Sequence, residues 1–252
     1  MIRIDSVTKS YSGKTVVDAV STTIPAGGVT SIIGPNGAGK STLLSLISRL
    51  IPMDSGAVSI AGLDIGRTPS KDLAKSMAIL RQENHITMRL RVRDLVGFGR
   101  FPHSGGHPTT EDRAHIEAAM DQLDLAEMAD SFLDELSGGQ RQRAYIAMVL
   151  AQDTDYLLLD EPLNNLDMKH SVEMMRMIRK LADDLGKTVV IVIHDINFAS
   201  CYSDTILAMR RGVLVHQGTP SKIMTQEVLR DIYDIDIRIE EIDGNRIGVY
   251  FA

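Results

Sequence analysis

The stretch that decides the fold is Gly34-Pro35-Asn36-Gly37-Ala38-Gly39-Lys40-Ser41-Thr42, which follows a short run of strand-forming residues at 29–33. A strand, a glycine-rich turn and a helix in this order are the setting of a P-loop, in which backbone N–H groups and the helix dipole bind phosphate. Lys40 would contact the β- and γ-phosphates of a nucleotide, and the Ser41 hydroxyl is an oxygen ligand for Mg²⁺. A glycine-rich turn arising by chance is the alternative, and the flanking strand and helix argue against it. We expect Pro52 just beyond the helix and an apolar stripe along it made by Leu43, Leu44, Leu46, Ile47 and Leu50.

Two acidic residues end the apolar run at 156–159. Ligands of open parallel sheets bind at the carboxyl ends of the strands, so this pattern predicts that Asp160 emerges beside the phosphate loop. Asp160 would hold Mg²⁺, directly or through water, and Glu161 would polarise the water that attacks the terminal phosphate. An acidic turn that caps the next segment is the alternative for this pattern alone. The P-loop in the same chain favours the catalytic interpretation.

A second glycine-containing helix start lies at Leu136-Ser137-Gly138-Gly139-Gln140. Ser137 is a good N-cap residue, and the three residues after it expose backbone donors at the start of a helix that continues to Leu150. An isolated Ser-Gly-Gly is most simply an ordinary capped helix. A compact domain that already has a phosphate loop does not need another such start for the same nucleotide. This second start is therefore the most informative feature of the chain.

Composition limits the class of protein. Of the 252 residues, 44% are apolar and 24% are charged, which is typical of a soluble globular chain. The net charge of −6 argues against nucleic acid as a partner, because a phosphate backbone needs a basic face. Cys201 is the single cysteine and indicates a reducing compartment. With no signal peptide and no apolar run near the roughly 20 residues that span a bilayer, we expect a cytoplasmic protein.

Strand and helix patterns alternate along the chain, and this order predicts an α/β fold with a largely parallel sheet. Between Glu83 and Leu150 the patterns are helical, with a Gly- and Pro-rich connection at 101–108, and Thr109 or Thr110 is placed to cap one helix. The expected organisation is one domain with a nucleotide-binding core at 1–82 and 151–234, a helical insert at about 83–150 and a β-hairpin tail at about 235–252. Expected strands lie at 2–4, 15–24, 29–33, 156–160, 189–193 and 205–209, and a further expected helix lies at 171–185.

Taken in order, these motifs resemble those of the ATP-binding cassette (ABC) transporter ATPases, and the resemblance covers essentially the whole chain. It is carried by 34–42, Gln82, 136–140, Asp160-Glu161, Leu166-Asp167 and His194. The resemblance implies a P-loop NTPase core of the RecA-like type, with an N-terminal antiparallel β subdomain and a helical insert. It also implies that the chain binds ATP and Mg²⁺. Two copies would pack head to tail, with each ATP between the phosphate loop of one copy and Ser137 and Gly139 of the other.

The same matching implies roles for single residues. Tyr11 resembles the aromatic residue that stacks on adenine, where a flat ring matches a flat base, although a tyrosine at a strand edge is the alternative. Gln82 resembles the residue that senses Mg²⁺ or water and contacts the transport partner. His194 stands at the position of the γ-phosphate histidine, although a lone histidine is more often structural. Asp167 would line the dimer interface. The sequence departs from the pattern at Asn164-Asn165, where many relatives carry small residues.

A compact chain with no attached membrane domain resembles the ATPase subunits of importers. Gly99-Arg100-Phe101-Pro102-His103 and the stretch 161–167 are similar to the iron–siderophore and cobalamin branch. The resemblance therefore implies ferric siderophore import in a bacterium, with cobalamin, haem or a metal as the alternative cargo. The implied partners are integral-membrane permease subunits and, through them, an extracytoplasmic substrate-binding protein. The chain would then lie peripherally on the cytoplasmic side of the plasma membrane.

Two other classes of protein remain as alternatives. A soluble cassette ATPase that acts on DNA or ribosomes usually carries two cassettes or a large added module, and neither is present. A P-loop GTPase or small-molecule kinase leaves the helix start at 137–140 unexplained, and the guanine-reading Asn-Lys-x-Asp pattern is absent.

Overall fold

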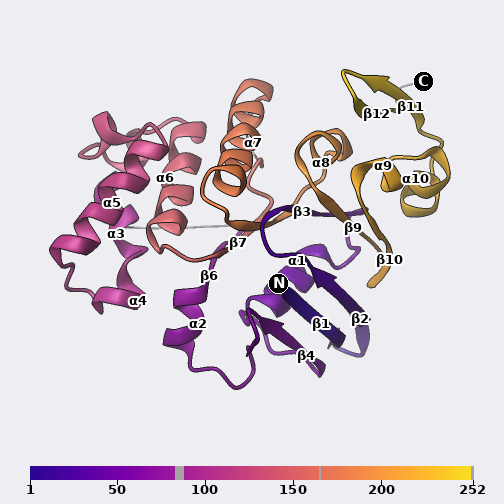
Figure 1. Cartoon of the computed structure of the whole chain (residues 1–252), viewed down its shortest axis with the longest axis horizontal. Helices are drawn as coiled ribbons and strands as arrows, with labels where there is room; N and C mark the ends of the chain where they lie inside the picture. The colour runs from indigo at the N-terminus through magenta and orange to yellow at the C-terminus, as the bar shows by residue number, and fades with distance from the viewer. Residues whose placement is uncertain (83–87, 165, 251–252) are drawn as a thin grey trace. The chain divides into compact units, whose positions relative to one another are not determined.

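The computed structural model describes residues 1–82, 88–164 and 166–250 of the chain. The chain divides into two compact units, one made of Met1–Thr68 and Ile178–Ala252 and the other of Pro69–Met177. Figure 1 labels the helices and strands of both units. Two sequence-based expectations, the start of the helical insert at Glu83 and the departure at Asn165, lie outside the described residues.

An antiparallel sheet opens the first unit, with its strands in the order β2 (Lys14–Ile24), β1 (Ile2–Tyr11), β4 (Ser55–Ile60) and β5 (Leu63–Asp64). Along the start of β1, Ile2 and Ile4 are buried while Arg3 and Asp5 are exposed, which is the period of two expected of a strand with one covered face. An irregularity between Ile4 and Val7 shifts this register by one residue, and Val7 is buried again. This sheet confirms the N-terminal antiparallel β subdomain and the strands expected at 2–4 and 15–24.

A second, mostly parallel group of strands forms the buried centre of the same unit. β3 (Gly28–Ile33) pairs in parallel with β8 (Thr188–Val192) and with β9 (Thr205–Arg210). β10 (Val213–Gly218) adds to β9 in the antiparallel direction. Every residue of β8 is buried, and so is β3 after its first residue. Such continuous burial explains why β8 is apolar after Thr188 and why neither strand alternates between apolar and charged residues.

Helix α1 (Lys40–Ile47) follows the phosphate loop and contacts β2 and β8. Four of the five predicted stripe residues are fully buried, namely Leu43, Leu44, Leu46 and Ile47. The prediction is wrong for Leu50, which lies beyond the helix and is 45% exposed. The reason is Arg49, whose φ of 57° is left-handed and cannot continue a right-handed helix.

The C-terminal part of the first unit ends in the expected β-hairpin. β11 (Arg238–Ile242) and β12 (Asn245–Val249) pair in the antiparallel direction. Asp243 and Gly244 turn between them with positive φ angles of 49° and 77°, as a tight hairpin turn requires. Three helices precede the hairpin, α8 (Ile196–Tyr202), α9 (Pro220–Ile223) and α10 (Gln226–Tyr233).

The second unit combines two parallel strands with a group of helices. β6 (Met77–Leu80) pairs in parallel with β7 (Tyr156–Asp160), which has the predicted bounds. Helices α3 (Val92–Phe98), α5 (Thr110–Gln122) and α6 (Gly138–Ala151) pack against one another, as Figure 1 shows. Helices α2 (Ser70–Ser76) and α4 (Phe101–Ser104) also lie wholly in this unit. The chain passes from this unit into the first one within α7 (Met168–Asp183).

Two details of the helical part bear on the sequence-based predictions. Thr109 caps α5 by accepting from the backbone N–H of Asp112, which confirms the predicted cap. The connection expected at 101–108 is partly wrong, because it contains the short helix α4. Pro102 is tolerated there because a proline in the first turn removes no intrahelical hydrogen bond. The α/β fold with largely parallel strands, an antiparallel N-terminal sheet and a helical segment is confirmed.

Candidate functional site

The phosphate loop joins β3 to α1 and has the backbone that its glycines predict. Gly34, Gly37 and Gly39 have φ angles of 141°, 76° and 97°, a region that favours glycine. A Cβ atom at Gly34 would collide with the carbonyl oxygen of Met209, and one at Gly39 would lie 2.5 Å from that of Val16. A Cβ atom at Gly37 would have no neighbour within 4 Å. The loop is therefore backed by protein at its two ends and open at Gly37.

Lys40, the first residue of α1, is held against this loop. Its Nζ donates to the carbonyl oxygens of Gly34 at 2.9 Å and Pro35 at 3.1 Å, and the residue is 5% exposed. Ser41 and Thr42 follow in the first turn of α1 and are half-buried. The ammonium charge and the start of the helix thus lie at one loop, which is the arrangement that binds an anion.

Tyr11 and His194 are the other candidates in the first unit. Tyr11 ends β1, with a ring that is 47% exposed and has Lys9 Nζ 5.4 Å from its centroid. His194 follows β8 and is exposed. The next residue, Asp195, caps α8, since its Oδ1 accepts from the backbone N–H groups of Asn197 at 2.7 Å and Phe198 at 3.1 Å. His194 therefore sits between a buried strand and a capped helix.

In the second unit, the parallel pairing of β6 and β7 brings Gln82 to Glu161. Leu80 is paired with Leu159, and the strands run in parallel. The residues two positions further along, Gln82 and Glu161, are therefore neighbours. Gln82 Nε2 donates to Glu161 Oε2 at 2.7 Å, and Asn164 Nδ2 donates to the same oxygen at 2.6 Å. The carboxylate is held by two amides. The bond from Asn164 uses the residue at which the sequence departs from the family pattern.

Asp160 and Glu161 stand in different environments although they are adjacent. Asp160 closes β7 and is 8% exposed. Glu161 comes after the strand with a φ of 49°, which is uncommon for a residue with a side chain. Backbone of this kind costs free energy and is concentrated at functional sites. The turn thus separates a buried carboxylate from one that projects out of the strand.

The helix start at 137–140 is a capping box, which confirms Ser137 as the N-cap of α6. Ser137 Oγ accepts from the backbone N–H of Gln140 at 3.3 Å, and Gln140 Oε1 accepts from the N–H of Ser137 at 2.9 Å. Ser137 and Gly138 are exposed, whereas Gly139 is buried. The cap holds the first turn of α6 with its serine and first glycine at the surface.

Asp167 is bound by a residue that sequence reasoning missed. Asp167 Oδ1 accepts from the backbone N–H of His170 at 2.9 Å and lies 2.8 Å from its ring Nδ1. These bonds, with the backbone one contributing most, hold the pKa of the Asp167 carboxyl below its usual value. The signal in the sequence was the Asp-x-x-His spacing, because a residue three positions after an N-cap can bond back to it.

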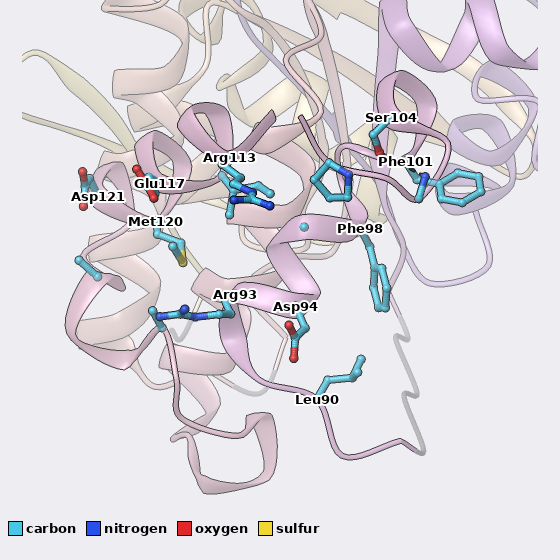
Figure 2. Close-up of a pocket in the computed structure, with 16 residues that line it drawn as sticks. Leu90, Arg93, Asp94, Phe98, Phe101, Ser104, Arg113, Glu117, Met120 and Asp121 are labelled. Carbon is cyan, nitrogen blue, oxygen red and sulfur yellow. Dashed lines mark hydrogen bonds between the residues drawn. The ribbon is translucent and has the colours of Figure 1, made fainter. Parts of the chain in front are cut away.

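Helices α3, α4 and α5 of the second unit line a groove of about 1060 Å³. Figure 2 shows Asp94 and Phe98 projecting from α3, Phe101 from α4 and Glu117 from α5. Phe98 and Phe101 are exposed residues, with 48% and 63% of their surface accessible. A groove with exposed aromatic rings and charges of both signs is typical of a protein-binding surface.

The candidate residues therefore fall on both units. The phosphate loop, Tyr11 and His194 belong to the first, and the others belong to the second. Within the second unit the structure brings Gln82 to Glu161, and it brings Asp167 to His170. Within the described ranges, no helix is both long and apolar enough to cross a bilayer.

A phosphate loop, a strand that ends in two acids and a capped Ser-Gly-Gly helix start together define an ATPase of the ATP-binding cassette class. The family model described as ABC transporter matches residues 17–164, and the chain belongs to this family. As a member it binds ATP and is an ATPase coupled to transport.

Similar proteins extend over the whole chain. The petrobactin import ATP-binding protein YclP of Bacillus subtilis (strain 168) is 57% identical over 252 residues, covering 100% of both chains. The petrobactin import ATP-binding protein FatE of Bacillus anthracis is 52% identical over 250 residues, covering 99% of this chain and 100% of the relative. A solved structure described as "Dimeric structure of a post-hydrolysis state of the ATP-binding cassette MJ0796 bound to ADP and Pi" has a TM-score of 0.77 and 30% identity, over 87% of this chain and 99% of that one.

Proposed function

We propose that this chain is the ATP-hydrolysing subunit of a ferric siderophore importer and that it works as a clamp of two copies. The observation that carries the clamp is the capped and exposed start of α6, with Ser137 and Gly138 at the surface. A helix N-terminus with exposed glycine N–H groups binds phosphate, and the chain already has a phosphate loop for its own nucleotide. The α6 start therefore binds the γ-phosphate of the ATP held by a second copy. The related dimeric cassette bound to ADP and Pi supports this pairing.

In the first unit, the phosphate loop at 34–42 and Lys40 bind the ATP phosphates. Tyr11 stacks on adenine, for which its half-exposed ring is suited. His194 donates to the γ-phosphate from its exposed position after β8. These groups position the nucleotide and balance the charge that develops in the transition state.

Mg²⁺ would be held by the Ser41 hydroxyl, the Asp160 carboxylate and the Gln82 side-chain carbonyl. Hard oxygen donors of this kind fit the ion, and Gln82 directs its NH₂ group to Glu161. When bound there, Mg²⁺ would supply positive charge that offsets the negative charge developing on the phosphates.

Glu161 is the general base that takes a proton from the attacking water. In this structure its Oε2 accepts bonds from Gln82 and Asn164, so the oxygen is engaged. Movement of Gln82 would leave this oxygen with the Asn164 bond only and free one of its acceptor positions for the water. Because Gln82 also contacts the transport partner, this bond links transport to hydrolysis.

A permease subunit binds the groove formed by α3, α4 and α5. The groove has a volume of about 1060 Å³, and the exposed side chains of Phe98 and Phe101 lie along it, so a segment of the permease can insert there. The chain would then lie on the cytoplasmic face of the membrane as a peripheral protein. An extracytoplasmic binding protein would deliver the cargo to the permease, and the net charge of −6 argues against a nucleic-acid partner.

The test of the base and of the clamp is Glu161→Gln. The amide has no carboxylate to accept a proton, so hydrolysis is expected to fall by at least about a hundredfold. ATP binding should stay within about twofold, because the phosphate loop is intact. Light scattering should show that the variant accumulates as a dimer in ATP. Hydrolysis at the wild-type rate would contradict the assignment of Glu161.

The cargo is tested by complementation. The names of the two relatives make ferric petrobactin the first cargo to try. A Bacillus subtilis strain without YclP would receive either this chain or its Glu161→Gln variant, and uptake of radiolabelled ferric petrobactin would be measured. We expect the wild-type chain to restore uptake and the variant to fail. If the chain assembles with the permease, hydrolyses ATP and restores no uptake, the cargo proposal is wrong while the ATPase proposal stands.

A further inference from the structure

His170 lies between two of the segments assigned to the contact between copies. On one side, its ring Nδ1 is 2.8 Å from Asp167 Oδ1, and its backbone N–H donates to the same oxygen. The imidazole therefore cannot rotate without breaking the ring bond. Because Asp167 accepts both hydrogen bonds, its pKa is lowered and the carboxylate stays charged at neutral pH.

On the other side, the same imidazole lies directly against Gly139. A Cβ atom at Gly139 would be 2.8 Å from Cδ2 of His170, 3.0 Å from Cγ and 3.4 Å from Nε2. Real side chains do not pack this closely, so the first turn of α6 rests on the ring edge without space for a methyl group. Gly139 is buried, whereas Ser137 and Gly138 in front of it are exposed.

We infer that His170 is a positioning residue for the γ-phosphate of the ATP bound to the second copy. The inference rests on the proposed clamp. One rigid ring sets the separation between Asp167 and the start of α6, so both are presented to the partner as a single surface. His170 touches no phosphate itself. It acts through Gly139, which together with Ser137 is expected to contact the γ-phosphate.

The physical reason is that phosphate binding at a helix start depends strongly on position. N–H groups displaced by about 1 Å lose hydrogen-bond geometry, and such displacements cost on the order of a hundredfold in enzyme rates. Without the ring, the first turn of α6 and Asp167 would each move independently. Binding of ATP to the chain's own phosphate loop does not use either segment and should not change.

The experiment compares substitutions at His170 in the full-length chain carrying Glu161→Gln, which retains ATP. His170→Ala removes the ring, while the backbone bond to Asp167 that caps α7 is kept. His170→Asn places an amide donor where Nδ1 was, and His170→Gln places it where Nε2 was, away from Asp167. Lys169→Ala is the matched control, since this neighbour is 78% exposed and pairs with Glu173 at 3.8 Å.

Two quantities are measured for each variant, the affinity of the monomer for mant-ATP and the ATP concentration at which half the protein is dimeric. For His170→Ala we expect mant-ATP affinity within about twofold of the parent and a dimerisation midpoint raised at least about tenfold. His170→Asn should stay close to the parent, and Lys169→Ala should not differ from it. A purely structural histidine would lower the melting temperature and leave the ratio of the two quantities unchanged.

An unchanged midpoint for folded His170→Ala, or an equal rise for Lys169→Ala, would overturn the inference. If His170→Ala does not fold, the comparison of His170→Asn with His170→Gln decides. A raised dimerisation midpoint for His170→Gln alone supports positioning by a side chain that is anchored on Asp167, and equal midpoints for the two variants contradict it.

Ser137→Arg is measured in parallel to test the clamp itself. If Ser137→Arg dimerises normally, the proposed clamp fails. If it does not and His170→Ala does, only the role of His170 is wrong.

Discussion

A buried ion pair between Arg100 and Asp112 holds the helical part of the second unit together. Arg100 Nε donates to Asp112 Oδ1 at 2.8 Å, and both side chains are 5% exposed. Arg100 also donates to the carbonyl oxygen of Ala151 at the end of α6, at 2.9 Å. Asp112 in turn accepts from the N–H and hydroxyl of Thr109, the cap of α5. One charge pair thus fastens the start of α5 to the end of α6.

This pair predicts a pH-dependent difference between the wild type and Asp112→Asn. The bonds from Thr109, then from Arg100, lower the pKa of Asp112 from 3.8 to about 2. Because the pKa of the folded state is the lower one, the carboxylate stabilises the fold above about pH 4, and this stabilisation is lost as the pH falls towards about 2. The variant leaves Arg100 buried without its charge partner and should melt several degrees lower at neutral pH.

Urea unfolding of both proteins from neutral pH down to about pH 3 checks this prediction. The difference between their free energies of unfolding should be largest near neutral pH. It should become smaller in acid, because only the wild type has a carboxylate at position 112 to lose. Asp121→Asn on the exposed face of α5 is the control. A difference that is constant across the range would show that Asp112 contributes by packing and not by charge.

At the level of elements, the C-terminal hairpin is fastened to α8, the helix that begins two residues after His194. Asn197 exchanges two bonds with Gly248, donating from Nδ2 to its carbonyl at 3.2 Å and accepting its N–H at 2.7 Å. Ser200 Oγ donates to the carbonyl oxygen of Arg246 at 2.7 Å. A Cβ atom at Gly248 would lie 2.8 Å from Cδ1 of Ile196, so the strand lies directly on the helix.

Asn197→Ala should release β12 from α8. It removes both bonds and leaves the N–H of Gly248 without its partner, which costs about 1–3 kcal/mol of stability. Amide exchange in β11 and β12 should accelerate, whereas exchange in β3 and β8 should follow the global stability only. Asn245→Ala is the matched control, because that side chain bonds only weakly within the turn, to the carbonyl oxygen of Asp243 at 3.4 Å. An equal effect of both substitutions would contradict this role of Asn197.

At the level of the whole molecule, each ATP site of the proposed clamp contains parts of two copies. Lys40→Ala destroys the phosphate-loop half, and Ser137→Arg destroys the α6 half. Each variant alone should be inactive. A mixture should recover activity, because a mixed dimer has one complete site, made of the phosphate loop of the Ser137→Arg copy and the α6 start of the Lys40→Ala copy.

Random pairing makes half of the dimers mixed, and each mixed dimer has one complete site of two. The recovered rate should therefore reach at most about a quarter of the wild-type rate. ATP hydrolysis by the assembled transporter, titrated with the ratio of the two variants, measures this rate. Mixing Lys40→Ala with Lys40→Met is the control, since both damage the same half and should give no recovery. Absence of recovery in the first mixture would indicate sites completed within one copy.

Local patterns in the sequence predicted the elements well. The run at 156–160 predicted the bounds of β7, Ser137 was identified as the cap of α6, and Asp243-Gly244 as the hairpin turn. These features depend on residues within a few positions of one another, whose backbone preferences and capping bonds are short-range. Where a local conformation overrode the apolar pattern, as the left-handed Arg49 did before Leu50, the prediction was wrong.

The sequence alone also determined the family. Each of its motifs is a short continuous stretch that can be recognised without any tertiary contact, namely the phosphate loop, the acids at the end of β7 and the Ser-Gly-Gly helix start. Only the tertiary structure showed that Gln82 and Asn164 both bind Glu161, and that His170 separates Asp167 from Gly139. The bond from Gln82 depends on the parallel register of β6 and β7, and the contact with Gly139 depends on where the His170 ring meets the first turn of α6. The contacts of Gln82 with Glu161 and of His170 with Gly139 join residues far apart in the chain, so they are set by strand pairing and packing and not by local propensity.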